Sequence, residues 1–259
     1  MAKNQSFGNP GNNRPKEIIV YREYYHVILL IDSSGSMLVP FLEEESNWEN
    51  EQSEDYKNAV KLTQNAMINA HAKALLALRG SCICNECFLK VTQYTFNSAK
   101  HKLNEAEELS SSGIDSVINI SEQNYKPFNG TALYNTIHEA LTLVYQNHLQ
   151  EPFEQMQRVD KVIIGVITDG EDTVLTDINM KNRKIEEIKS LLKKLRGGIT
   201  YRHLDSSVLI GLISQDFTKN KLDEVKEELT FDEAISIVQS DEKAIRKAFK
   251  LFSTDAANP

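Results

Sequence analysis

The sequence is short of several features that would assign it to a class of protein at once. It has only three cysteines and one tryptophan in 259 residues, and no apolar run approaches the roughly 18 residues that a membrane-spanning helix needs. Acidic residues outnumber basic ones, 37 to 29, whereas a general nucleic-acid-binding protein requires a basic face. We therefore expect neither a membrane segment nor a nucleic-acid partner.

The N-terminal residues lack the apolar stretch of a secretory signal, and their Asn, Gly and Pro content predicts a flexible arm over residues 1–17. Cys82, Cys84 and Cys87 lie close together, and an odd number of cysteines without an export signal indicates a reducing compartment. They supply three of the four ligands of a structural zinc site, so buried thiols are the better interpretation. These observations predict a cytoplasmic protein.

Three short, nearly continuous apolar runs predict strands that are buried on both faces, as in the middle of a parallel sheet. These runs cover residues 27–31, 162–167 and 208–213. Residues 87–96 are rich in β-forming side chains and predict a further strand, and residues 116–120 do so more weakly. Residues 231–238 fit either a short strand or a turn of helix.

Segments with helical spacing of apolar residues alternate with these strands, and one of them is followed by Gly197 and Gly198 as a stop signal. The alternation predicts a doubly wound α/β fold with a mainly parallel central sheet, helices on both faces and one antiparallel edge strand. No Gly/Ser-rich linker interrupts the chain, so we expect a single domain over residues 18–259. A strongly acidic insertion covers residues 38–55.

Oxygen-bearing side chains follow two of the predicted inner strands and precede a predicted helix. The first run leads into Asp32-Ser33-Ser34-Gly35-Ser36, the second ends at Asp169, and Thr131 lies just before a helix. Ligands bind beyond the carboxyl ends of the strands in doubly wound sheets, so these groups should share one edge. Two carboxylates and three hydroxyls are hard oxygen donors that suit Mg²⁺, Mn²⁺ or Ca²⁺.

The pattern Asp32-x-Ser34-x-Ser36, then Thr131, then Asp169 resembles the metal-ion-dependent adhesion site of von Willebrand factor A (vWA) and integrin I domains. The resemblance extends over roughly residues 24 to 253. It implies that the serine hydroxyls ligate the cation directly, that Asp32 acts through water, and that Thr131 and Asp169 act directly or through water.

The same resemblance implies that a partner protein supplies an Asp or Glu that completes the coordination shell. The phrases DSSGSM and TDGED are more similar to the intracellular bacterial branch, some of whose members are adaptors in tellurite-resistance or stress systems. The chain departs from many relatives in the acidic insertion at 38–55, which could lend the cation a Glu or shape the partner surface.

A Mg²⁺-dependent phosphoryl-transfer or hydrolytic enzyme that uses Asp32 and Asp169 is the alternative function. The sequence has neither a phosphate-binding P-loop nor a G-x-S-x-G nucleophile motif. Haloacid-dehalogenase-type enzymes carry a second Asp at the position that Ser34 occupies, so the general acid is missing here. We therefore expect a cation-dependent protein-binding module rather than an enzyme, and we interpret Glu171 and Asp172 as the start of a solvated loop.

Overall fold

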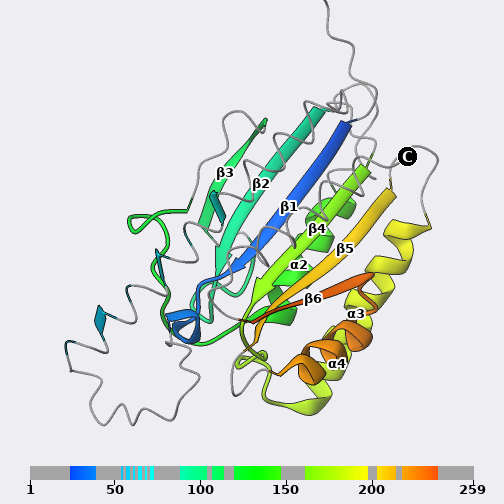
Figure 1. Cartoon of the computed structure of the whole chain (residues 1–259). Helices are drawn as coiled ribbons and strands as arrows, with labels where there is room; N and C mark the ends of the chain where they lie inside the picture. The colour runs from blue at the N-terminus through cyan, green and yellow to red at the C-terminus, as the bar shows by residue number, and fades with distance from the viewer. Residues whose placement is uncertain are drawn as a thin grey trace, which may run out of the picture.

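The computed structural model describes residues 24–38, 88–103, 107–113, 120–146, 161–197, 203–213 and 218–238, together with scattered positions between 54 and 72. These residues form a six-stranded sheet with the strand order β3-β2-β1-β4-β5-β6 (Figure 1). The strands are β1 (Tyr24–Asp32), β2 (Phe88–Phe96), β3 (Glu107–Gly113), β4 (Lys161–Thr168), β5 (His203–Ile213) and β6 (Glu233–Val238). All neighbouring strands pair in parallel except β2 and β3, which are antiparallel.

The predicted fold class is confirmed by this sheet. The three apolar runs lie in β1, β4 and β5, which are adjacent inner strands, and β3 is the one antiparallel edge strand. Residues 231–238 resolve as strand β6. The weak strand prediction at 116–120 is wrong at Ile120, which lies outside any strand, and its other residues fall outside the described part of the chain.

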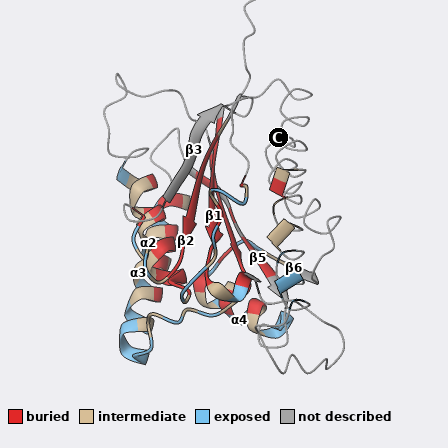
Figure 2. Ribbon diagram, turned by 90° about the vertical axis from the view of Figure 1, so that its left-hand side faces the viewer, coloured by how far each residue is buried: buried red, intermediate tan, exposed pale blue. Residues whose placement is uncertain are grey.

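One face of the sheet is covered by α2 (Leu133–Val144), α3 (Ile178–Arg196) and α4 (Lys219–Leu229). The apolar stripes of these helices pack on alternate residues of the strands, such as Ile28 and Leu30 of β1, to form one core. Figure 2 shows β1 and β2 buried along most of their length, while the outer side of α3 is exposed. Gly197 caps the end of α3, as the sequence predicts.

The other face of β1 is equally buried, because Tyr25, Val27, Leu29 and Ile31 are at most 1% exposed. The helical position His71 reaches the sheet on this side and hydrogen bonds to Gln93 of β2, which pairs with Leu29 in the sheet register. Helical residues therefore lie against both faces. Within the described part of the chain, none of the helices has both the length and the apolar character to cross a membrane.

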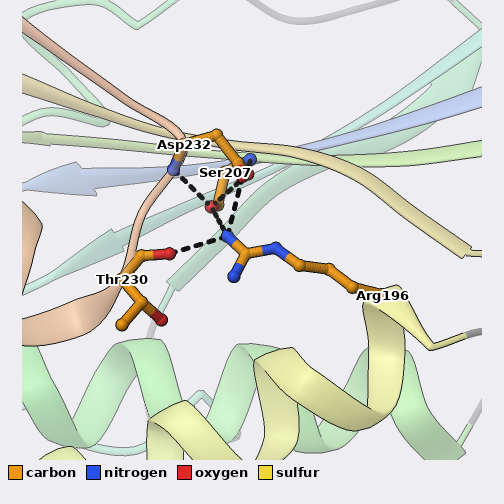
Figure 3. A network of polar contacts seen from close by, with 4 residues as sticks. All are labelled: Arg196, Ser207, Thr230 and Asp232. Carbon is orange, nitrogen blue, oxygen red and sulfur yellow. Dashed lines mark hydrogen bonds and ion pairs between the residues drawn. The ribbon is translucent and has the colours of Figure 1, made fainter.

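A network of hydrogen bonds joins the C-terminal end of α3 to β5 and to the turn before β6 (Figure 3). The guanidinium of Arg196 donates to the carbonyl oxygen of Thr230 at 2.7 Å and to the carboxylate of Asp232 at 2.9 Å. That carboxylate also accepts the backbone N–H of Ser207 at 2.7 Å. Because these residues come from α3, β5 and the turn before β6, the network joins three elements.

Several predictions fall on residues outside the described part of the chain. They are the flexible arm at 1–17, most of the acidic insertion at 38–55 and the environment of Cys82, Cys84 and Cys87. The single-domain assignment for 18–259 also stays a prediction, because parts of that range are not described.

Candidate metal site

The site begins where β1 ends, at Asp32, whose side chain is completely buried. One carboxylate oxygen accepts the backbone N–H of Ser34 at 2.8 Å, and the other accepts the hydroxyl of Thr168 at 2.7 Å. The backbone carbonyl of Asp32 accepts the phenol hydroxyl of Tyr125 at 2.9 Å. Asp32 therefore shapes the loop that follows β1 and joins it to the end of β4.

The predicted donors converge at the carboxyl end of the central strands. The hydroxyl oxygens of Ser34 and Ser36 are 3.0 Å apart, and the Ser36 hydroxyl donates to the carboxylate of Asp169 at 3.0 Å. A Cβ atom added to Gly170 would lie 3.8 Å from the hydroxyl oxygen of Thr131 and 3.9 Å from that of Ser36. Thr131 thus lies beside the other donors, although it is far from them in the sequence.

The segment before Thr131 is attached to the loop after β1 by backbone hydrogen bonds. The N–H of Phe128 donates to the carbonyl of Ser33 at 2.9 Å, and the N–H of Gly35 donates to the carbonyl of Asn129 at 2.7 Å. Asn129 adopts a left-handed conformation with φ 61°, which asparagine tolerates better than most residues. These contacts fix the approach of Thr131 to the serine loop.

Burial makes ionisation of the two carboxylates unfavourable. Burial raises the pKa of Asp32 from its ordinary value of 3.8 to about 6. Burial and the nearby charge of Asp32 raise the pKa of Asp169 to about 7. Within the described part of the chain, neither carboxylate forms an ion pair with a Lys or Arg. A bound cation would supply the missing positive charge.

The donor set decides which cations can fit. Among the residues that the structure describes, no three His, Cys, Asp or Glu side chains gather to hold a metal. The group instead combines the carboxylates of Asp32 and Asp169 with the hydroxyls of Ser34, Ser36 and Thr131. Oxygen donors of this kind suit Mg²⁺, Mn²⁺ or Ca²⁺ and do not favour Zn²⁺ or copper.

The structure adds residues that the sequence interpretation missed. Thr168 could have been noticed as a polar residue that ends an apolar strand, whereas no sequence signal indicates that Tyr125 binds the backbone of Asp32. Glu171 is exposed and Asp172 is partly exposed in the loop after β4, as predicted, but Asp172 also binds backbone groups. Its carboxylate accepts the N–H groups of Tyr134, Val174 and Leu175, each at 2.8 Å, because the first turn of α2 and the loop after β4 both leave donors free there.

Comparison with known proteins gives matches among solved structures alone. No family model and no curated protein sequence matches the chain. The PilB minor pilin from Streptococcus sanguinis matches with a TM-score of 0.54 and 14% identity, over 91% of this chain and 61% of the pilin. The open form of the pilus adhesin SpaC from Lactobacillus rhamnosus GG matches with a TM-score of 0.52 and 9% identity, over 90% of this chain and 30% of the adhesin.

The matches show a shared α/β fold and no more. The strand order and the antiparallel edge strand agree with the doubly wound fold class that the sequence predicts. The vWF domain of the type V pili tip protein Mfa5 from Porphyromonas gingivalis also matches over 95% of its length and 90% of this chain, at 10% identity, but a TM-score of 0.46 carries no argument. At these identities the matches show the fold alone, and the chain spans less than two thirds of the pilin.

The comparisons overturn the prediction of a cytoplasmic protein. The matching structures are a minor pilin and a pilus adhesin, and pili are cell-surface assemblies. The prediction rested on the odd number of cysteines and on the composition of the first residues, neither of which reports on the folded domain. The finer resemblance to tellurite-resistance and stress-associated members is not supported by these matches either.

Proposed function

We propose that this chain is a protein-binding module that engages its partner through a divalent cation, with Mg²⁺ as the preferred ion. Asp32, Ser34, Ser36, Thr131 and Asp169 would hold the ion. The observation that carries the proposal is the convergence of these residues, from three separate segments, at the carboxyl edge of the sheet. The similarity of the fold to pilus proteins supports a role in protein–protein interaction.

The spacing of the donor oxygens is compatible with a small divalent cation. Neighbouring ligands of an octahedral Mg²⁺, at metal–oxygen distances of about 2.1 Å, are about 3.0 Å apart. The separations between the Ser34 and Ser36 hydroxyls and between the Ser36 hydroxyl and the Asp169 carboxylate are both 3.0 Å. Hydrogen bonds hold both pairs at these separations.

The burial of the donors supports a partner that supplies a carboxylate. Ser34, Thr131 and Asp169 are buried, whereas Ser36 at the mouth of the site is exposed. Both carboxylate oxygens of Asp32 already accept hydrogen bonds from the protein, which fits a contact with the ion through water. A cation held chiefly by hydroxyls and water would keep much of its double charge and attract an Asp or Glu of another protein.

The enzyme alternative finds less support. A nucleophilic carboxylate must face its substrate, and the side chain of Asp32 is 0% exposed with both oxygens hydrogen bonded to Ser34 and Thr168. A general acid beside it is missing, because Ser34 stands at the position where such enzymes carry an Asp. The binding module remains the better proposal.

Calorimetric titration of the chain with Mg²⁺ tests the proposal directly. We expect saturable binding by the wild type and its loss in Thr131→Ala and Asp169→Ala, with Thr176→Ala, exposed in the loop after Asp169, as the matched control. Capture of partners should then be compared in Mg²⁺ and in EDTA for the same variants. Absence of Mg²⁺ binding by the folded wild type would refute the proposal. So would partners that every variant retains equally in Mg²⁺ and in EDTA.

A further inference from the structure

The loop after β4 holds the backbone of Thr131 through a single residue, Thr173. The hydroxyl of Thr173 accepts the N–H of Thr131 at 2.7 Å and is 3.2 Å from the Thr131 carbonyl. The N–H of Thr173 also donates to that carbonyl at 2.8 Å. Thr173 therefore satisfies both backbone groups of Thr131, and these contacts form a clamp between the two loops.

The surrounding residues are adapted to this clamp. A Cβ atom added to Gly130 would lie only 2.2 Å from the hydroxyl oxygen of Thr173, so the clamp can close only because residue 130 has no side chain. The N–H of Gly130 donates to the Ser98 hydroxyl at 3.0 Å, which also holds the glycine in place. Asp172, next to Thr173, accepts the N–H of Tyr134 and so attaches the first turn of α2 to the same loop.

These contacts connect Thr131 directly to the loop that carries Asp169. Asp169 lies four residues before Thr173 in the same loop, and the backbone of Thr131 itself bonds to that loop, while the two residues before Gly130 bond to the loop after β1. The distance between the Thr131 hydroxyl and the Asp169 carboxylate thus depends on the clamp. Mg²⁺ demands near-ideal geometry with short metal–oxygen distances, whereas Ca²⁺ accepts longer and more variable ones.

We propose that Thr173 is a positioning residue that fixes Thr131 relative to Asp169 and thereby makes the site prefer Mg²⁺ to Ca²⁺. The proposal rests on the proposed cation-binding function and adds to it the residue that sets its ion selectivity. Thr173 does not contact the cation. It acts through the backbone of Thr131, as groups that orient metal ligands do in other metal sites.

Calorimetric titration of the full chain with Mg²⁺ and separately with Ca²⁺ tests this role. Thr173→Val keeps the shape of the side chain but removes the acceptor for the Thr131 N–H. It should weaken Mg²⁺ binding by about tenfold, the lower end of what loss of such groups costs, and Ca²⁺ binding by less, so that the preference for Mg²⁺ falls. Thr173→Ser retains the hydroxyl and should keep both affinities, and Thr176→Val serves as the control in the same loop.

The outcomes separate the two proposals. If the wild type binds neither ion, the proposed function fails and the selectivity role fails with it. If the wild type binds Mg²⁺ and Thr173→Val has the same ratio of Mg²⁺ to Ca²⁺ affinity, the positioning role alone is overturned, even if its melting temperature in EDTA is lower. Should Thr173→Val not fold, Gly130→Ala takes its place, since its Cβ pushes Thr173 away, and an unchanged ratio in that variant overturns the role equally.

Discussion

Replacing Asp32 by asparagine should make the cation-free protein more stable, although it removes a carboxylate that the site needs. The rise of the Asp32 pKa from 3.8 to about 6 corresponds to about 3 kcal/mol of unfavourable free energy for the ionised side chain in the folded protein. Asparagine has nearly the same shape and no charge. The change should also relieve Asp169, whose pKa is raised in part by the charge of Asp32.

The hydrogen bonds of Asp32 can survive this substitution. The amide oxygen can still accept the N–H of Ser34, and the amide nitrogen can donate to the Thr168 hydroxyl. The hydroxyl proton of Thr168 would then turn to the carbonyl oxygen of Gly170, which lies 3.3 Å away. The second N–H of the amide has no partner among the described residues, so its burial offsets part of the electrostatic gain at every pH.

The gain should depend on pH in a defined direction. The folded protein holds the Asp32 proton more tightly than the unfolded chain, so protonation of Asp32 stabilises the wild type fully below about pH 4, and this contribution is lost as the pH rises through about 6. The advantage of the uncharged variant therefore grows as the pH rises. The stability of Asp32→Asn relative to the wild type should therefore be about 2 kcal/mol greater at pH 7.5 than at pH 4.5 in EDTA.

Urea denaturation followed by circular dichroism measures both values, with Glu224→Gln on the exposed side of α4 as a charge control. Addition of Mg²⁺ at about 100 times its dissociation constant should stabilise the wild type by roughly 2.7 kcal/mol and leave Asp32→Asn unchanged. A relative stability of Asp32→Asn that does not increase between pH 4.5 and pH 7.5 in EDTA would refute the electrostatic argument.

Three further predictions concern other parts of the structure. Burial lowers the pKa of His71 to about 4, so the free energy of unfolding of the wild type should fall by up to about 3 kcal/mol as the pH falls from 6.5 towards 4. His71→Gln should remove this part of the pH dependence. Equal falls in the free energy of unfolding of the two proteins over this pH range would contradict the prediction. Gly170→Ala should bind Mg²⁺ as the wild type does, whereas Gly170→Leu, whose side chain lies beside the donors, should bind about tenfold more weakly by calorimetry, and equal affinities would show that this position does not border the ion. Arg196→Ala should lower the free energy of unfolding, measured in urea, by about 1–2 kcal/mol, because its hydrogen bonds to Thr230 and Asp232 are lost. The control is Arg183→Ala, on the exposed side of α3. An equal or smaller loss in Arg196→Ala than in the control would count against the network.

The central sheet could be predicted from the sequence because its strands are buried on both faces and so consist of nearly unbroken apolar runs. The edge strand β3 was not predicted from the sequence, because its sequence EELSSSG has little apolar content and the strand is held by backbone pairing to β2. The five candidate donors were predictable because each lies next to a strand end or a helix start. Their supporting groups were not, because Tyr125 and Asp172 contribute to the site through long-range hydrogen bonds that no local pattern encodes.

The hydrogen bonds between Ser36 and Asp169 and between Thr168 and Asp32 join residues that are 133 and 136 positions apart in the chain. They exist only when β1 and β4 are paired, whereas β3 and β6 at the edges contribute no donor to the site. A bound cation should therefore slow amide hydrogen exchange in β1 and β4 far more than in the edge strands, which can open without releasing it. Cation binding would thus require the pairing of β1 with β4, whereas the edge strands β3 and β6 could separate from the sheet while the partner stays bound.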